Sequence, residues 1–199
     1  MTHESKRRNS KSFTAKYFDE LYAKDSDPWR FATSPYEHSK YLATLDILNG
    51  QPLGTVFEVG CSIGVLTRAL ASNCDSILAV DGSEIPLAKA RRECDELGNV
   101  TFAQMRIPAE WPSISFDLIL FSEVLYCLDP NDIQETARKT VQSLSPMGRV
   151  LLVYWLGDTD YPCSGDEACD IFISTAKESL KVVQWRRNED YRLDLLRLA

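Results

Sequence analysis

The sequence predicts an α/β protein built on a doubly wound, mostly parallel sheet that ends in a C-terminal antiparallel hairpin. Short apolar runs alternate with amphipathic helical stretches from Thr55 to Trp155, an alternation that is typical of parallel sheets. The run from Phe116 to Phe121, FDLILF, is almost continuously apolar, as strands are when a parallel sheet is covered on both faces. Because 44% of the 199 residues are hydrophobic, we expect residues 1–199 to form a single domain with a substantial core.

The first fifty residues predict a helical leader ahead of the first strand. Residues 1–12 are polar and basic, and we expect them to be disordered. Phe13 to Tyr22 places its apolar side chains on one helical face. The pair Ser34-Pro35 supplies an N-cap and a proline at the first helical position, and Asn49-Gly50 ends the second helix. We expect residues 13–50 to act as a lid over the ligand-binding turn that follows.

Hydrophobic periodicity, punctuated by glycine and proline, predicts the remaining elements in order along the chain. Strands are predicted at Thr55–Val59, Ser76–Val80, Val100–Ala103, Phe116–Phe121 and Arg149–Trp155, and the final hairpin at Leu180–Arg187 and Tyr191–Leu198. Helices are predicted from Val65 to Leu70, from the N-cap Ser83 to Leu97, from Asn131 to Leu144 and from Asp166 to Lys177. A turn at Pro146-Met147-Gly148 is predicted to precede the strand that begins at Arg149.

The turn from Gly60 to Gly64, GCSIG, joins the first strand of the sheet to a helix. Ligands bind at such turns because unpaired N–H groups of the helix point outward there. A dinucleotide site would need G-x-G-x-x-G, but Ser62 stands where the second glycine should be. The same residues match G-x-S-x-G, the nucleophile elbow of α/β-hydrolases, whose histidine follows the serine in the chain. Both histidines, His3 and His38, precede Ser62, which argues against a hydrolase.

A third chemistry, binding of S-adenosylmethionine (SAM), fits the spacing best. The second strand ends in Asp81, twenty-one residues after Gly60. A carboxylate at that place can accept hydrogen bonds from both ribose hydroxyls of a bound nucleoside. The sequence therefore favours a SAM site made of the glycine turn and Asp81.

Charge and cysteine usage exclude several classes of partner. The net charge of −7 argues against a nucleic-acid ligand, which would favour a basic face. No stretch resembles a membrane span or a secretory signal. The six cysteines include no C-x-x-C pair, so we expect reduced thiols of a cytoplasmic protein and no metal site.

Several segments together carry a resemblance to a known family. They are Leu21-Tyr22, Asp27-Pro28-Trp29, Ser34-x-Tyr36-Glu37-x-x-Lys40-Tyr41, Phe57-Glu58-x-Gly60-Cys61-Ser62-Ile63-Gly64, Asp81, Phe116-Asp117-Leu118 and Ser122-Glu123-Val124-Leu125-Tyr126. The chain resembles the class I SAM-dependent methyltransferases, and within them the rhizobial nodulation methyltransferases of the NodS family. The resemblance implies a Rossmann-like fold and SAM as the methyl donor. It also implies N-methylation of the free amine on the non-reducing terminal glucosamine of a de-N-acetylated chitooligosaccharide, a Nod-factor precursor.

Candidate cofactor-binding residues lie in the leader and after each strand. We expect Glu58 to meet the amino-acid end of SAM, and Lys40 or Arg30 to meet its carboxylate. Met105 and Arg106 lie where this class of enzyme stacks the adenine. The full set is Trp29, Arg30, Tyr36 and Lys40 in the leader, Glu58, Gly60, Cys61, Ser62 and Gly64 at the first turn, Asp81, Gly82 and Ser83 at the second, and Met105, Arg106 and Ser122 after the third and fourth strands.

Candidate catalytic residues follow the buried strand, at the edge where acceptor substrates bind in open α/β sheets. Glu123 is the candidate for orienting or deprotonating the acceptor amine, with Tyr126 beside it. His38 is the other titratable candidate. Each has a structural alternative: an ion pair at a helix start for Glu123, and an ordinary surface or core position for His38. Methylation of another acceptor and a non-catalytic SAM-binding module remain alternatives.

Overall fold

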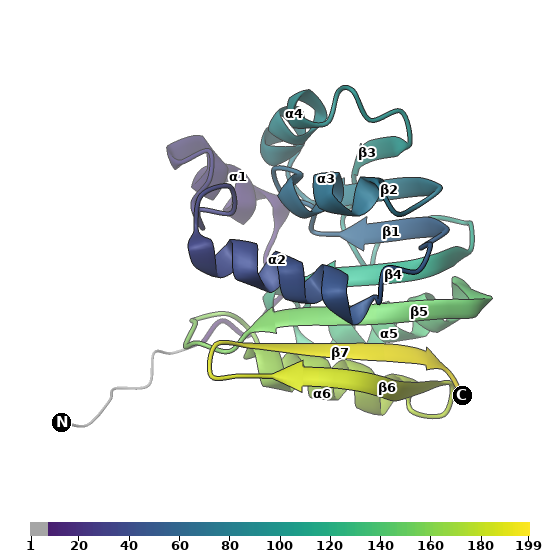
Figure 1. Ribbon diagram of the computed structural model, residues 1–199. Coiled ribbons are helices and arrows are strands. Elements are labelled where there is room, and N and C mark those ends of the chain that lie inside the picture. The colour runs from purple at the N-terminus through teal and green to yellow at the C-terminus, as the bar shows by residue number, and fades with distance from the viewer. Residues whose placement is uncertain (1–7) are drawn as a thin grey trace.

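The computed structural model describes residues 8–199, which form a seven-stranded sheet of order β3-β2-β1-β4-β5-β7-β6 (Figure 1). The strands are β1 (Thr55–Val59), β2 (Ser76–Asp81), β3 (Val100–Gln104), β4 (Phe116–Ser122), β5 (Leu144–Trp155), β6 (Leu180–Arg187) and β7 (Tyr191–Leu198). Strands β1 to β5 pair in parallel, whereas β7 is antiparallel to both β5 and β6. The predicted α/β class and the terminal hairpin are confirmed.

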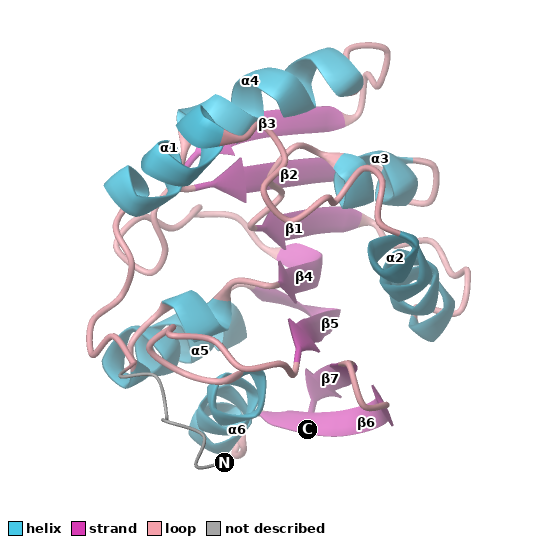
Figure 2. Cartoon of the chain, turned by 90° about the vertical axis from the view of Figure 1, so that its left-hand side faces the viewer, coloured by secondary structure: helices cyan, strands magenta, loops and turns pink. Residues whose placement is uncertain are grey.

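Helices cover both faces of this sheet (Figure 2). They are α1 (Ala15–Lys24), α2 (Pro35–Ile47), α3 (Val65–Ala71), α4 (Glu84–Glu93), α5 (Pro130–Gln142) and α6 (Gly165–Ala176). Helices α2, α3 and α4 share one hydrophobic cluster with the sheet, which includes Ile47, Leu70 and Leu87. Helices α5 and α6 pack on the other face through residues such as Ile133 and Phe172. This two-layer burial explains why β4, enclosed on both faces, is almost wholly apolar.

The leader crosses the carboxyl edge of the sheet. Helix α1 lies beyond the strand tips, and α2 runs along one face (Figure 1). The predicted cap of α2 is present, since the Ser34 hydroxyl accepts a hydrogen bond from the Glu37 N–H. The disorder predicted for residues 1–12 falls partly outside the described residues. Within the described part, Asn9 N–H donates to the Asp160 carbonyl and the Ser12 hydroxyl accepts from the Asp129 N–H.

Two predicted boundaries are wrong by four residues or more. Helix α4 ends at Glu93 rather than Leu97, because Cys94 leaves helical geometry at a φ of −121° and buries its thiol against the Gly64 carbonyl. Strand β5 begins at Leu144, and the predicted turn after it is a bulge inside the strand. Phe116 of β4 pairs with Leu144, and Leu118 pairs with Arg149. Residues 145–148 of β5 therefore loop out between these two pairs.

Candidate functional site

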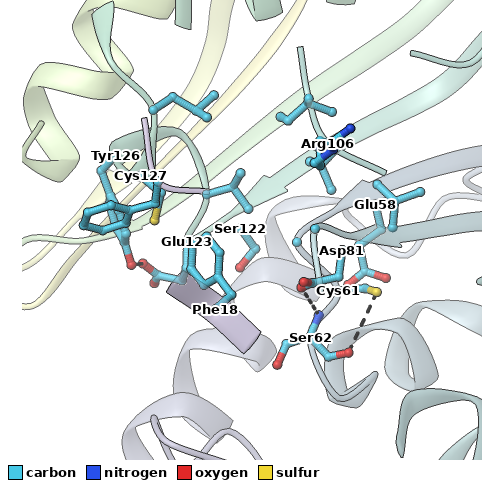
Figure 3. Close-up of a pocket in the computed structure, with 18 of the residues that line it drawn as sticks. Phe18, Glu58, Cys61, Ser62, Asp81, Arg106, Ser122, Glu123, Tyr126 and Cys127 are labelled. Atoms are coloured by element: carbon cyan, nitrogen blue, oxygen red, sulfur yellow. Dashed lines mark hydrogen bonds between the residues drawn. The ribbon is translucent and has the colours of Figure 1, made fainter. Parts of the chain in front are cut away.

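The carboxyl ends of the parallel strands border a cavity of about 890 Å³. The turns after β1 and β2 line one side, which we call the β1–β2 half: Glu58, Gly60, Cys61, Ser62, Asp81 and Gly82. The segment after β4, the end of β5 and helix α2 line the other side, which we call the β4–β5 half: Tyr36, Glu37, Lys40, Glu123, Tyr126 and Trp155. Figure 3 shows Asp81 and Glu58 on one side and Glu123 and Tyr126 on the other.

The turn after β1 needs glycine because it is pressed against β4. Gly60 has a φ of 81°, and a Cβ there would lie 2.0 Å from a methyl carbon of Val124. The N–H groups of Gly60 and Cys61 both donate to the Val80 carbonyl, at 2.8 and 3.0 Å. These contacts bring the ends of β1, β2 and β4 together. Ser62, with a φ of 49°, lines the cavity beside them.

Asp81 is held by backbone donors from two turns. Its Oδ2 accepts from the Ser62 N–H at 3.1 Å (Figure 3) and its Oδ1 from the Ser83 N–H at 2.9 Å. Burial raises the pKa of Asp81 to about 6, and these backbone hydrogen bonds oppose the rise. Each oxygen retains lone-pair capacity beyond its backbone bond. The carboxyl group is therefore fixed in direction and still able to accept hydrogen bonds from a ligand in the cavity.

Glu58 is a buried acid without a cation. Its side chain is 1% exposed, and its Oε2 has no hydrogen-bond partner among residues 8–199. Burial raises the pKa of Glu58 to about 7; Thr67 lowers it in part, although the Thr67 hydroxyl forms no hydrogen bond of normal geometry. A buried carboxylate is costly unless it is paired. The β1–β2 half therefore suits a ligand that brings an ammonium group to Glu58 and hydroxyls to Asp81.

Helix α1 is joined to both turns of this half by hydroxyl contacts. The Tyr22 hydroxyl lies 2.5 Å from the Ser62 hydroxyl, and the Ser83 hydroxyl lies 2.5 Å from Asp19 Oδ1. Burial raises the pKa of Tyr22, so its hydroxyl stays neutral. Helix α1 thus covers the β1–β2 half through two hydroxyl contacts, one with the neutral Tyr22 and one with the carboxylate of Asp19.

The β4–β5 half is organised around a buried lysine on α2. Lys40 is 1% exposed, and its Nζ lies 3.0 Å from Glu37 Oε2 and pairs with Glu123 Oε1. The same Nζ lies 5.0 Å from the centre of the Tyr36 ring, within cation–π range. A buried ammonium needs such partners, so α2 is anchored to the end of β4 by charge.

Glu123 is enclosed by donors. Beyond Lys40, its Oε2 accepts from the Tyr126 hydroxyl at 2.6 Å, and the Trp155 N–H lies 3.1 Å from both oxygens. It adopts a φ of 60°, an uncommon conformation that places its carboxylate over the ends of β4 and β5. Burial, with Glu123 nearby, raises the pKa of Tyr126 well above its ordinary value.

Most of the residues predicted from the sequence line this cavity. They are Trp29, Tyr36, Lys40, Glu58, Gly60, Cys61, Ser62, Asp81, Gly82, Met105, Arg106, Ser122, Glu123 and Tyr126. Lys40 does so as the partner of two glutamates, which differs from the expected contact with a ligand carboxylate.

Four predicted residues lie elsewhere. Arg30 points outward and pairs with Asp25 at 3.0 Å. Gly64 packs against α4, where a Cβ would lie 3.0 Å from the Ala90 Cβ. Ser83 caps α4. His38 is exposed and borders a separate cleft of about 290 Å³, so it does not reach the cavity as a catalytic histidine would.

Sequence reasoning missed two residues that shape the site. Glu37 stands three positions before Lys40, a spacing at which helical side chains meet, and this signal could have paired them. Tyr22 meets Ser62 across 40 residues of chain, and no local pattern marks that contact.

Residues 8–199 contain no group of three or more His, Cys, Asp or Glu side chains that could hold a metal ion. None of the helices in this part of the chain is long and apolar enough to cross a membrane.

Comparisons with known proteins agree with this architecture. A family model described as Nodulation protein S (NodS) matches residues 16–189. Nodulation protein S of Rhizobium tropici is 27% identical over 127 residues, which cover 63% of this chain and 53% of that relative. The match spans 53% to 59% of the length of the first three curated relatives.

Two solved structures superimpose on most of the chain. The N-methyltransferase NodS from Bradyrhizobium japonicum WM9, in complex with S-adenosyl-L-homocysteine (SAH), gives a TM-score of 0.81 at 23% identity and covers 92% of this chain and 97% of that one. A putative methyltransferase from Pseudomonas syringae gives a TM-score of 0.71 at 30% identity, covering 81% and 98%. Because the NodS structure is only 23% identical to this chain, its likeness establishes a shared fold.

Proposed function

Since the chain belongs to the NodS family of SAM-dependent methyltransferases, as the match over residues 16–189 establishes, we propose that it transfers a methyl group from SAM to an amine. The acceptor we propose is the free amine on the non-reducing terminal glucosamine of a de-N-acetylated chitooligosaccharide. The relatives' names associate the family with nodulation. The chemistry of the cavity supports the cofactor and an acceptor with sugar faces.

The observation that carries the cofactor assignment is the pair of uncompensated acids in the β1–β2 half. SAM has an ammonium group that suits the unpartnered Oε2 of Glu58 and a ribose diol that suits Asp81. Neither acid forms an ion pair with any of residues 8–199. When bound, SAM supplies a methyl group on a positively charged sulfur, which is a good leaving group.

The residues of this chain need mainly to orient the acceptor and exclude water, which is proximity catalysis. Helix α1 covers the cofactor side, where the Tyr22 hydroxyl meets Ser62. On the acceptor side, the Tyr161 ring lies 5.2 Å from that of Tyr126 and 5.1 Å from that of Phe13. Such rings offer an apolar wall with polar tips, which suits the faces of a sugar.

A thermal-shift experiment tests the cofactor assignment. SAH at about one hundred times its Kd should stabilise the protein by about 2.7 kcal/mol, a rise in Tm of roughly 5–10 °C for a chain of this size. Asp81→Ala should remove most of that rise. His38→Ala, on the exposed side of α2, should keep it. A wild-type protein whose Tm does not change at millimolar SAH would contradict the proposal.

Methyl transfer tests the acceptor. Labelled methyl from SAM should appear on chitosan oligomers, which carry free amines, and not on chitin oligomers, whose amines are acetylated. Equal labelling of both series would point to a hydroxyl acceptor instead. Labelling of neither, with SAH binding intact, would refute the oligosaccharide.

A further inference from the structure

Two glutamates in the β4–β5 half share one lysine but differ in how they are held. Lys40 Nζ contacts both Glu37 and Glu123, so the two carboxyl groups lie within two hydrogen-bond lengths of each other. Both line the cavity. The question is which of them can exchange a proton with an acceptor amine, because an amine must be neutral to attack a methyl group.

Glu123 has no free position for that proton. A carboxylate offers about four lone-pair sites, and those of Glu123 accept from Lys40, the Tyr126 hydroxyl and the Trp155 N–H. A proton placed on it would break at least one of these contacts. Glu123 therefore links α2, the turn after β4 and the end of β5 through its hydrogen bonds.

Glu37 is held at one point. Within residues 8–199, Lys40 is the hydrogen-bond donor to its side chain, at 3.1 Å from Oε1, and lies 3.0 Å from Oε2. Glu37 is 7% exposed yet lines the cavity. Burial raises the pKa of Glu37, Lys40 opposes the rise, and Glu123 and Asp27 add to it. A carboxyl group with a raised pKa is better matched to proton exchange near neutral pH.

The groups around Glu37 come from each element packed against it. They are Lys40, Tyr36 and Tyr41 on α2, Asp27 before that helix, and Glu123 after β4. The charges of Lys40 and Glu123 offset each other, which leaves Glu37 and Asp27 as acids in excess. Asp27 accepts from the N–H groups of Phe31 and Ala32, so it is committed to the turn.

We propose that Glu37 is the proton acceptor for the substrate amine, and that Lys40 and Glu123 position it. An incoming ammonium group gives one N–H proton to the Glu37 carboxylate. The freed nitrogen lone pair forms the N–C bond as the C–S bond breaks with its electrons left on sulfur, and Glu37 later releases the proton to water. This inference rests on the proposed amine methylation.

Glu37→Gln tests the proposal because it keeps the shape of the side chain and an acceptor for Lys40. Single-turnover methyl transfer should fall by about 10²–10⁴-fold, with SAH affinity unchanged. The wild-type rate should decline at low pH with a midpoint set by the pKa of Glu37. In Glu37→Gln the midpoint of this decline should shift to higher pH, to the pKa of the amine. Binding of the amine to SAH-loaded protein, followed against pH, should show the same displacement without turnover.

Two further variants complete the test. Glu37→Asp keeps the carboxylate and should retain the wild-type decline at low pH with a reduced rate. Glu20→Gln, an exposed position on α1, should leave rate and profile unchanged. If Glu37→Gln keeps the wild-type rate and profile, this inference alone is refuted. If the wild-type protein binds SAH but methylates no amine, the proposed function fails and the inference fails with it.

Discussion

The two halves of the cavity handle buried charge in opposite ways. In the β1–β2 half, Glu58 and Asp81 face the cavity without a cation, and burial raises the pKa of both. In the β4–β5 half, two glutamates surround the buried ammonium of Lys40. The leader follows the same division, since α1 attaches to the first half by hydroxyl contacts and α2 to the second by an ion pair.

This contrast separates acids that have no cation among residues 8–199 from acids that share one. Buried acids without a partner are costly, so a ligand that brings positive charge to the β1–β2 half relieves a cost that the protein carries alone. The β4–β5 half already contains one cation, Lys40, which its two glutamates share. We therefore expect α1 to move when the cofactor enters and α2 to stay in place as a fixed wall.

The largest effect should come from removing the cation of the β4–β5 half, which would leave its acids unpaired, as those of the β1–β2 half are. Lys40→Met keeps the apolar stem but leaves Glu37 and Glu123 buried without a cation. Breaking a buried ion pair typically costs about 3–5 kcal/mol, measurable here by urea denaturation. Lys16→Met, an exposed lysine on α1, is the matched control and should change stability by less than about 0.5 kcal/mol. Equal losses in the two variants would show that Lys40 is not an anchor.

The second effect concerns pH and the first half. Burial raises the pKa of Glu58 from 4.5 to about 7, so the folded state favours its protonated form. Its contribution to stability is therefore full below pH 4.5 and is lost as pH rises through 7. Between pH 5 and 8 the wild-type protein should lose on the order of 2–3 kcal/mol of its free energy of unfolding through Glu58, and Glu58→Gln should not show this loss.

Urea denaturation at several pH values measures this slope. A residual slope nearer pH 6 should remain in Glu58→Gln, because the pKa of Asp81 is raised in the same direction, to about 6. Saturating SAH should flatten the wild-type slope, since the ligand then supplies the missing cation. An unchanged slope in the variant would contradict the assignment of this buried cost to Glu58.

The smallest effect should come from weakening the contact of helix α1 with the β1–β2 half. Tyr22→Phe removes the hydroxyl that meets Ser62, a loss of about 1 kcal/mol. Amide hydrogen exchange should quicken in α1 but not in α2, and SAH should dissociate faster. Tyr41→Phe on α2 is the control, because its hydroxyl forms no hydrogen bond with the described residues. Faster exchange in both helices would mean that the leader moves as one piece.

The sequence was informative wherever the signal is local. The bounds predicted for Thr55–Val59, Leu180–Arg187 and Tyr191–Leu198 match the structure, because strand periodicity and turn residues are short-range features. The positions of Asp81 and Glu123 at the sheet edge follow from parallel pairing, which brings carboxyl ends of strands together.

Contacts between distant segments were not predictable in this way. Lys40 and Glu123 are 83 residues apart, and nothing in either segment specifies the other. His38 follows Glu37 on α2, yet the turn of the helix carries it away from the cavity. A single position in a helix therefore separates a side chain that lines the cavity from one on the surface, and sequence spacing alone did not distinguish the two.

The long span between Lys40 and Glu123 also has a consequence for assembly on the ribosome. Helix α2 emerges long before β4 has been synthesised, so Lys40 remains hydrated until its partner arrives. A second tie, from the Tyr36 hydroxyl to the Asp190 carbonyl, spans 154 residues. Contacts of such separation form slowly because long loops must close first. The contacts that hold α2 beside β4 and β5 are thus complete only after nearly the whole chain has been translated.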